Sequence, residues 1–402
     1  MKTKSLGCIL LLICLTILSG CWSRRELNDL AIVMALGVDL DKDGYAVSAQ
    51  VMNPGQAGSL SGGSNGSLPV VTYKATGKTM PEALQRMLST TPRTLYLAHV
   101  RVLVFGEAYA RQGVGDAIDF LTRNHELRTD FFLLVAKHTD AFRILDVITP
   151  FEQIPANSLY SSILVSHKNW AGTGKVTLQQ FIVELERGGS NPIMSGVQLQ
   201  GDTSEQGSVK NVQSVIPKSL IKQAGIAVFK KDKLIGWLGE APSKTVNYVL
   251  NEVYTTEGSI DCPDGGVAGF IITDAKSRIR ISINEQDEPE FVIHLIAEAN
   301  LTTLHSRLDL SQTASIKELE QRMEEKFDNL MAVNIRLVQE KFDSDIFGLG
   351  EELHRQYPKL WRSYRKHWDE SFQSVKVSVK SDVAIRRIGS VVQPQQKEME
   401  QK

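Results

Sequence analysis

Four cysteines supply the thiols of this 402-residue chain: Cys8, Cys14, Cys21 and Cys262. A deprotonated thiol is a strong nucleophile, so a cysteine in a suitable sequence can take a covalent modification. Three of the four lie within the first 21 residues, whereas Cys262 lies alone in the turn sequence Asp261–Gly266. No base or metal-ligating partner is evident beside Cys262, so we expect the covalent chemistry at Cys21 and an incidental thiol at Cys262.

The residues before Cys21 predict that this cysteine is exposed by processing and then modified. Two lysines precede an apolar run over residues 6–18, which is too short to cross about 30 Å of hydrocarbon as a mature helix. We therefore expect a signal peptide over residues 1–20. It ends in the lipobox pattern, an aliphatic residue and two small residues before the cysteine: Leu18, Ser19, Gly20 and Cys21. An ordinary secretory signal with an incidental cysteine is the alternative.

Cleavage between Gly20 and Cys21 would leave Cys21 as the attachment site of a diacylglyceryl group. Two acyl chains contribute about 0.8 kcal/mol per buried methylene, which is enough for stable membrane anchoring. No later stretch reaches the roughly 18 apolar residues that a membrane span needs, so we expect the body of the protein outside the bilayer. Only Cys262 would keep its thiol, and no intramolecular disulfide is expected.

Residues 39–44 match the first half of a calcium-binding EF-hand loop, in which oxygen ligands alternate before a glycine. The twelfth position of such a loop is a bidentate glutamate, but here it is Gln50. The flanking residues also have strand patterns where the motif requires helices. We therefore expect a polar hairpin turn and no calcium site.

Two other segments end like a Walker A loop, whose glycines let backbone N–H groups approach a phosphate. Residues 77–79 read Gly-Lys-Thr, but Thr72 stands where the motif needs its first glycine. Residues 171–175 fail in the same way, with Asn169 in that position. Both segments are interpreted as loops, and nucleotide binding is not expected.

The eight histidines form no pattern that would hold a metal ion or run catalysis. None occurs in an HExxH motif, and they are scattered along the chain. His99 and His294 lie in expected strands and are interpreted as structural. No catalytic residue, metal ion or cofactor is therefore predicted. The full set is His99, His125, His138, His167, His294, His305, His354 and His367.

Basic residues alternate with aromatic residues between His354 and Trp368. At helical spacing the aromatic residues form a stripe that packs into a core, and the basic residues form the solvated face. Contact of that face with anionic lipid headgroups or an acidic partner is the alternative. Nucleic acid is not an expected partner, because 45 basic and 46 acidic residues give a net charge of -1.

The elements that position these residues predict an α+β fold. Hydrophobic residues make up 42% and charged residues 23% of the chain, which is typical of globular proteins. The length predicts two or three domains. We expect a multidomain mixed α/β body, with several sheets each packed by helices, behind a lipidated N-terminus.

In the first half, alternating apolar residues and turn sequences predict a hairpin followed by a βαβ unit. A capping-box sequence, Thr79–Glu82, marks the start of one helix. Residues 139–186 have mostly helical patterns, broken near the prolines and again at 171–174. The expected strands are 31–39, 45–52, 70–76, 94–105 and 131–135, with a helix over 107–123 and a flexible Gly/Ser-rich stretch over 54–69.

In the second half, we expect a hairpin over 224–239 and strands at 278–284 and 291–301. A second capping box, Ser315–Glu318, is expected to open a long amphipathic helix. A further helix runs through 353–368, and alternating valines at 375–379 predict a closing strand. The stripe of the long helix comprises Ile316, Leu319, Met323, Phe327, Leu330, Ile335, Val338 and Phe342.

These patterns divide the chain after the signal peptide. Residues 21–195 are expected to form an N-terminal α/β region, or two domains if the body has three. Residues 196–219 are polar and without sustained periodicity, so they are expected to be a linker. Residues 220–390 are expected to form a C-terminal α/β domain, and residues 391–402 a disordered tail.

Taken along its length, the chain resembles the Ger(x)C family of spore germination lipoproteins, the C subunits of nutrient germinant receptors. The resemblance rests on the order and spacing of several segments spread over nearly the whole mature chain. They are 21–39 (CWSRRELNDLAIVMALGVD), 97–114, 122–137, 224–239 (AGIAVFKKDKLIGWLG), and an ending in which Trp368 and Phe372 precede VKVSVK and Ile388-Gly389.

The resemblance implies a non-enzymatic protein of mixed α/β domains on the outer face of the spore inner membrane. It implies two partners, a multi-spanning A subunit and a transporter-like B subunit, and it carries the lipid-bearing cysteine onto Cys21. It transfers no ligand-contacting residue. A solute-binding lipoprotein that delivers amino acids or sugars to a transporter is the alternative, and a cell-wall hydrolase is a weaker one because no paired catalytic groups are found.

Overall fold

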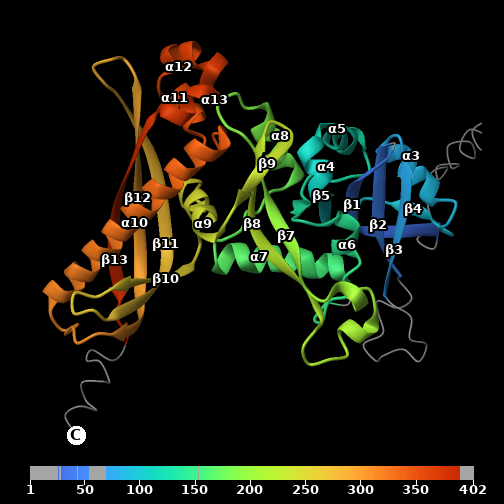
Figure 1. Cartoon of the computed structure of the whole chain (residues 1–402), viewed down its shortest axis with the longest axis horizontal. Helices are drawn as coiled ribbons and strands as arrows, with labels where there is room; N and C mark the ends of the chain where they lie inside the picture. Colours follow the sequence, from blue (N-terminus) through green and yellow to red (C-terminus); the bar gives the residue numbers. More distant parts are fainter. Residues whose placement is uncertain (1–25, 27–28, 43, 54–68, 153, 390–402) are drawn as a thin grey trace, which may run out of the picture.

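The computed structural model describes residues 26, 29–42, 44–53, 69–152 and 154–389. Within these residues thirteen strands form two sheets, and helices pack against both. Figure 1 shows the sheets side by side along the long axis of the molecule, with helix α9 (Glu240–Val249) between them. This arrangement confirms the expected α+β fold. The segments expected to be a signal peptide and a C-terminal tail, and nearly all of the Gly/Ser-rich stretch, lie outside the described residues.

The larger sheet has nine strands among the described residues, in the order β3-β2-β1-β5-β6-β7-β8-β9, with β4 beside β1. Its middle is parallel, through the pairs β1/β5, β5/β6 and β6/β7, and its two ends are antiparallel. The strands are β1 (Leu30–Asp41), β2 (Gly44–Met52), β3 (Val70–Gly77), β4 (Thr94–Tyr96), β5 (Val102–Gly106), β6 (Phe132–Ala136), β7 (Ile193–Gly201), β8 (Ser219–Lys230) and β9 (Lys233–Leu238).

Helices cover both faces of this sheet. Its central strands β5 and β6 are therefore buried at every residue. Alternate residues of β5 belong to different core clusters: Leu103 and Phe105 pack with α4, α5 and α8, and Val102 and Val104 pack with α6 and α7. The helices are α3 (Met80–Met87), α4 (Glu107–Gln112), α5 (Gly115–Arg123), α6 (Ala141–Leu145), α7 (Pro155–Asn169) and α8 (Leu178–Glu186).

The expected hairpin of β1 and β2 is confirmed, with Asp41 paired to Gly44 across the turn. The incomplete calcium motif lies in this turn, as expected for a polar hairpin. The predicted start of α3 is also confirmed, since the Thr79 hydroxyl accepts the Glu82 N–H at 3.2 Å. The Glu82 carboxylate reaches back one residue further than in a capping box and accepts the Lys78 N–H at 2.8 Å.

Residues 94–105 do not form the single strand that their alternation predicts. The chain turns at 97–101, where the Val100 N–H donates to the Leu97 carbonyl, and β4 and β5 each pair in parallel with β1. Leu97 and Val100 are buried by this turn, so the apolar alternation continues without a strand.

The expected helix over 107–123 is likewise interrupted, at Gly113, whose φ of 136° favours glycine. The βαβ unit of β5, α4, α5 and β6 is confirmed.

The segment expected to be a linker lies inside the larger sheet. β7 continues to Gly201, two short 3-10 turns follow, and β8 then pairs antiparallel with β7. The hairpin of β8 and β9 therefore completes the first sheet and not the second. Whether 21–195 and 220–390 fold as separate units stays a prediction.

The smaller sheet has the order β10-β11-β12-β13, with antiparallel pairs except for β12 and β13, which are parallel. β11 and β12 are each 17 residues long and extend well beyond the expected strands. β10 was not expected, because its sequence TEGSID is polar. The strands are β10 (Thr256–Asp261), β11 (Val267–Ile283), β12 (Pro289–His305) and β13 (Lys376–Arg387).

The long helix α10 (Thr313–Phe342) packs along this sheet, as Figure 1 shows. It begins before Ser315, after Gln312, and has no side-chain cap, so the capping box expected at Ser315–Glu318 is wrong. A backbone turn from Asp309 to Gln312 starts the helix instead. Leu330 is exposed and Met331 is buried in its place, because the buried face continues in steps of four from Phe327.

The single helix expected through 353–368 is divided into shorter ones. α11 (Leu349–Gln356) ends before Tyr357, and α12 (Pro358–Tyr364) begins at the proline, which cannot continue a preceding helix. α13 (Trp368–Ser374) follows a short 3-10 turn. The closing strand is confirmed as β13, which pairs with β12.

Side chains and backbone from both halves meet at the junction of the two sheets. The Lys230 ammonium of β8 lies 2.7 Å from the Asp343 carboxylate and 3.5 Å from that of Asp369. The Ser344 hydroxyl donates to the Phe229 carbonyl at 2.7 Å. A side chain at Gly236 would meet the Phe342 ring, so this glycine allows the end of α10 to approach β9.

Candidate functional site

The residues predicted to carry the lipid and the cleavage site lie outside the described residues. Their assignment, Leu18, Ser19 and Gly20 before Cys21, therefore stays a prediction. In the part of the chain that the structure describes, no helix is both long and apolar enough to cross a membrane. No group of three or more His, Cys, Asp or Glu side chains there is placed to hold a metal ion.

The side chain of the first aspartate of the incomplete calcium motif is hydrogen-bonded to the start of a helix. Asp39 is buried, and its carboxylate accepts the N–H groups of Ala141 at 2.7 Å and Phe142 at 3.0 Å, at the start of α6. Burial raises the pKa of Asp39, although the two N–H donors act in the opposite direction. Asp39 therefore ties the hairpin to α6.

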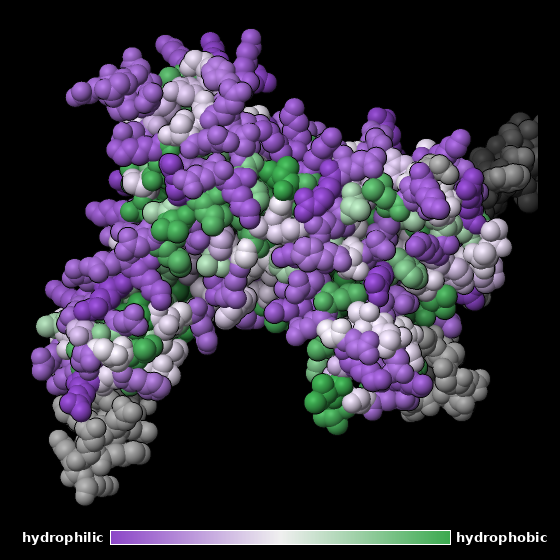
Figure 2. Space-filling view, viewed as in Figure 1, coloured by the Kyte–Doolittle hydropathy of each residue, from purple (hydrophilic) through white to green (hydrophobic). Residues whose placement is uncertain are grey.

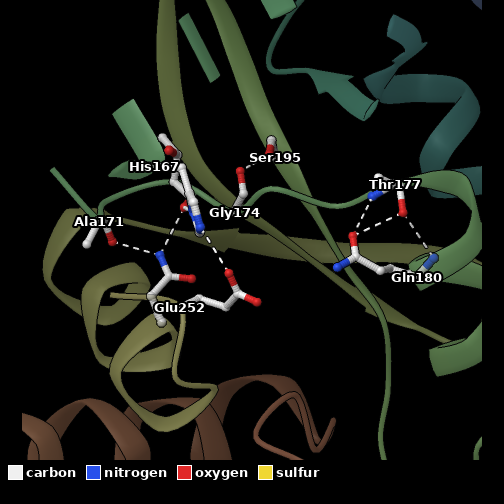
Figure 3. A network of polar contacts seen from close by, with 9 residues as sticks. His167, Ala171, Gly174, Thr177, Gln180, Ser195 and Glu252 are labelled. Carbon is white, nitrogen blue, oxygen red and sulfur yellow. Dashed lines mark hydrogen bonds and ion pairs between the residues drawn. The ribbon is translucent and has the colours of Figure 1, made fainter. Parts of the chain in front are cut away.

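The loop 171–175, which resembles the end of a Walker A motif, is held by side chains of other elements (Figure 3). The Asn247 amide of α9 donates to the carbonyls of Ala171 at 2.7 Å and Thr173 at 2.9 Å. The Ser195 hydroxyl of β7 donates to the Gly174 carbonyl. These contacts occupy the loop's carbonyls and fix it between the two sheets, which is a structural role.

The same network contains a buried histidine that the sequence did not distinguish from the other seven. His167, at the end of α7, is 3% exposed, and its Nε2 lies 3.0 Å from the Glu252 carboxylate (Figure 3). The hydrogen bond with His167 lowers the pKa of Glu252. Because the two residues are far apart in sequence, spacing gave no signal for this pair.

The two histidines expected to be structural have different environments. His294 of β12 lies 2.7 Å from the Asp382 carboxylate of β13, which agrees with a structural histidine. His99 lies in the turn between β4 and β5 and is exposed, so its expected strand position is wrong. Cys262 is buried at the end of β10, and burial raises the pKa of its thiol, which disfavours the nucleophilic thiolate.

The aromatic and basic residues of 354–368 divide as expected except at Tyr357. Trp361 and Trp368 are buried and stack edge-to-face with a centroid distance of 5.6 Å, and the basic residues are exposed. Tyr364 packs on Trp368 in the same way. The expected core stripe is therefore confirmed at Trp361 and Trp368 but is wrong at Tyr357, which is exposed, and the basic face is solvated.

A cleft of about 760 Å³ lies between the two halves of the molecule. One wall comes from the loop before α8, from α8 and from the chain leading to β7; the other comes from the end of α9, from β11 and from α11. Its apolar lining includes Phe181, Ile193, Ile346 and Phe347. A concave, largely apolar space with a few charged groups is the usual form of a ligand site.

Charged side chains line the cleft, and its acidic members all have partners. Glu252 lies beside His167, Glu184 beside Arg187, Glu352 beside Arg355 and Glu351 beside His354. Three basic residues of the lining, Lys175, Arg278 and Arg280, form no ion pair within 4.0 Å among the described residues. The sequence analysis missed them, although the alternation of Lys276, Arg278 and Arg280 along one strand face was a readable signal.

Two areas of the surface expose large apolar side chains. Leu330, Val333 and Leu337 form a stripe on the outer face of α10. Val215, which is 99% exposed, and Ile216 lie at the tip of the loop between β7 and β8. Figure 2 shows apolar side chains gathered in both regions, and such patches are typical of interaction surfaces.

Comparison with known proteins identifies the chain from end to end. A family model described as the spore germination protein N-terminal domain matches residues 23–199. A second model, described as spore germination B3/GerAC like, C-terminal, matches residues 224–389. The two models follow one another without overlap and together cover most of the chain.

Several relatives match over almost their whole length. Spore germination protein KC of Bacillus subtilis (strain 168) is 28% identical, covering 97% of this chain and 97% of the relative. The putative spore germination protein YfkR of the same organism is 26% identical, with 97% and 98% covered. Spore germination protein GerQC of Bacillus cereus is 21% identical, with 95% and 98% covered.

A solved structure has the same fold. The crystal structure of the GerBC protein matches with a TM-score of 0.56 at 18% sequence identity, over 87% of this chain and 96% of that chain. The two family models, in their order along the chain, identify it at the level of sequence. The chain therefore belongs to the GerAC-like family of spore germination proteins, the C subunits of germinant receptors.

Proposed function

We propose that this chain is the lipid-anchored C subunit of a nutrient germinant receptor and supports its assembly and signalling. Cys21 carries a diacylglyceryl group after cleavage behind Gly20, and the two-sheet body lies on the outer face of the spore inner membrane. The protein acts by binding partners and not by catalysis. The observation that carries the proposal is the match of both family models, in order, directly behind the lipobox cysteine.

The surface of the body supports a docking role. The exposed apolar stripe of Leu330, Val333 and Leu337 lies on a helix whose opposite face is already buried against the second sheet. Solvent contact of such side chains is unfavourable by roughly 25 cal/mol per Å² of apolar surface, so a partner would gain from covering them. The proposed partners are the multi-spanning A and B subunits of the receptor.

Lipidation tests the proposal most directly. We expect Cys21→Ala to abolish lipid attachment and to reduce the membrane-bound fraction about tenfold or more, because two acyl chains are lost. Spores that carry this variant should also respond poorly to the nutrient of that receptor. The measurements are metabolic labelling with a fatty acid, membrane fractionation, and germination followed by loss of optical density.

Cys262→Ala is the matched control for this experiment. It removes the other thiol of the mature chain, from a buried site, and should leave labelling and fractionation unchanged. If Cys21→Ala stays with the membrane and its spores germinate normally, then the anchor has no part in function. If Cys21→Ala loses the lipid and spores germinate normally, then the proposed need for the lipid in receptor assembly and signalling is wrong.

The cleft between the two halves supports a second candidate, a solute-binding lipoprotein that delivers amino acids or sugars to a transporter. Binding proteins of that class hold their solute between two lobes. Co-purification from detergent-solubilised spore membranes separates the two functions. Recovery of A and B receptor subunits would favour the first, and recovery of an uptake transporter without them would favour the second.

A further inference from the structure

Five basic and four acidic side chains line the cleft between the two halves, and three of the basic ones form no ion pair within 4.0 Å among the described residues. Lys175 enters from the loop before α8, and Arg278 and Arg280 enter from β11 on the opposite wall. The four acidic residues of the lining are each beside a basic or histidine side chain. Two of these carboxylates, Glu252 and Glu351, lie beside histidines that carry a charge only when protonated, so the lining has a net charge of +1, and its cations without an ion pair are Lys175, Arg278 and Arg280.

Two of the three cations, Arg278 and Arg280, are close enough to act on one group. Arg278 and Arg280 are two residues apart on one strand, so their side chains leave the same face about 7 Å apart. Lys276 continues this row by one more step and is also without an ion pair among the described residues. Guanidinium groups bind carboxylate and phosphate oxygens with two parallel hydrogen bonds, which favours such a group at the mouth of the cleft.

A buried hydroxyl adds a polar contact with no partner. Ser277 is 7% exposed and lines the cleft, and its Oγ forms no hydrogen bond among the described residues. Its backbone N–H and carbonyl are both bound by the Asn251 side chain. Strand alternation directs the Ser277 side chain to the face of β11 opposite to Arg278 and Arg280, so this hydroxyl is available to another part of a ligand and not to the group held by the two guanidinium groups.

The depth of the cleft favours an apolar portion in the same ligand. Phe181, Ile193, Ile346 and Phe347 lie on its walls, and its volume of about 760 Å³ is in the range of small-molecule sites. The volume is too large for an inorganic ion alone. Because cationic and apolar side chains both line the cleft, the lining favours an amphiphilic anion.

We propose that this cleft binds a small organic anion, with its carboxylate or phosphate group among Lys175, Arg278 and Arg280 and its apolar portion between the two halves. Binding there would join the two halves, because each contributes one wall. The inference goes beyond the docking role and is independent of the lipid on Cys21.

Calorimetric titration of the mature chain in non-ionic detergent tests the inference. The probes are benzoate and phenyl phosphate, with benzylamine as a control that has the same ring and the opposite charge. We expect at least one anion to bind one-to-one and at least tenfold more tightly than benzylamine. Arg278→Gln with Arg280→Gln should weaken that binding tenfold or more, and raising the salt concentration should weaken it as well.

Lys359→Gln with Arg362→Gln is the matched control, because these exposed residues of α12 do not line the cleft. Both double variants should unfold at the temperature of the unmodified protein, which excludes misfolding as the cause. Equal binding of anions and benzylamine, or unchanged affinity in the Arg278 and Arg280 variant, would overturn the proposal. Binding of a glutamate-rich peptide without either small anion would also overturn it and would assign the cleft to a protein segment.

Discussion

Asp345 is a fully buried carboxylate that organises the start of α11. It accepts the backbone N–H groups of Phe347 at 3.0 Å, Gly348 at 2.9 Å and Gly350 at 2.8 Å, and the Trp368 indole N–H at 3.0 Å. No cation is among its hydrogen-bond partners. Burial raises the pKa of Asp345 to about 6 in spite of these four donors. A single carboxylate thus connects the end of α10 to α11 and α13.

We expect Asp345→Asn to lower the free energy of unfolding by about 1–3 kcal/mol, because the new amide N–H groups would face N–H donors. Asp274→Asn, at an exposed aspartate of β11, should change it by less than about 0.5 kcal/mol. Chemical denaturation of both variants at pH 7 measures these values. Equal effects of the two substitutions would show that the four hydrogen bonds contribute nothing.

The raised pKa of Asp345 also predicts a pH dependence of known sign. Between about pH 4 and pH 6 the folded protein binds a proton at Asp345 that the unfolded chain has released, so this residue's contribution to stability falls as pH rises through that window. From pKa values of 3.8 and about 6, the fall is about 3 kcal/mol. The difference between unmodified protein and Asp345→Asn, measured from pH 4 to pH 7, isolates it. A difference that is constant with pH would contradict the pKa assigned to Asp345.

At the scale of residues, a site of covalent modification could be predicted from the sequence. Which side chains pair with one another in the interior could not. Cys21 could be predicted as a modification site because processing enzymes recognise a contiguous pattern, and this assignment stays a prediction. His167 and Glu252, or Asp345 and Trp368, meet only after the chain has folded, and nothing in their spacing marks them. Arg278 and Arg280 were visible as alternating basic residues, but their meaning depends on a cleft wall contributed by another part of the chain.

Among the elements, β11 has an edge that side chains cover. β10 pairs with residues 267–272 only, so beyond them one edge of β11 has no strand beside it. Asn251 binds the N–H and the carbonyl of Ser277, Gln356 donates to the Ile279 carbonyl, and the Tyr357 hydroxyl donates to the Ile281 carbonyl. Open strand edges promote pairing between molecules, and these contacts block that pairing.

We expect Asn251→Ala to lower the free energy of unfolding by about 2 kcal/mol and to promote self-association. The substitution removes both hydrogen bonds to Ser277 and leaves at a φ of 62° a residue that tolerates the left-handed region less well than asparagine does. Asn251→Gly is the control, since it loses the same bonds without backbone strain and should be less destabilising. Denaturation and sedimentation velocity measure the two effects; an Asn251→Ala protein that is fully stable and monomeric would show that the cap is dispensable.

The elements themselves were predicted where local signals were strong. The β1/β2 hairpin, the start of α3 and the strand β13 follow from periodicity and turn or cap chemistry within a few residues. The failures have local causes as well: the turn at 97–101 buries residues with strand-like spacing, and Pro358 divides a helix whose aromatic stripe continues across it. α10 begins at a backbone turn that carries no sequence signature.

For the whole molecule, the division of the chain and the division of the sheets do not coincide. The second family model begins at residue 224, yet β8 and β9 are edge strands of the first sheet. The sequence predicted a boundary from composition, and polar composition cannot reveal that the strands on either side of a loop pair with each other. The pairing of strands that are separated by a long loop is the part of the fold that could not be predicted from a single sequence.

Truncation tests where the first half of the molecule ends. A fragment of residues 22–239 keeps every strand of the larger sheet, and we expect it to be soluble and monomeric by size-exclusion chromatography. A fragment of residues 22–219 lacks β8 and β9, leaves the edge of β7 without a partner, and should aggregate. A monomeric, folded 22–219 fragment would instead support the boundary expected from composition.

The parallel pairing of β12 with β13 has a consequence for the order in which the protein folds. Residues 306–375 separate the two strands, so one edge of β12 has no partner until residues 376–387 have been synthesised. During that interval Phe291, Ile293 and Leu295, which α10 and β13 help to bury, belong to an incomplete core. Closing such a long connection is slow compared with closing a hairpin. The second half of this protein can therefore complete its core only after almost the whole chain has been synthesised.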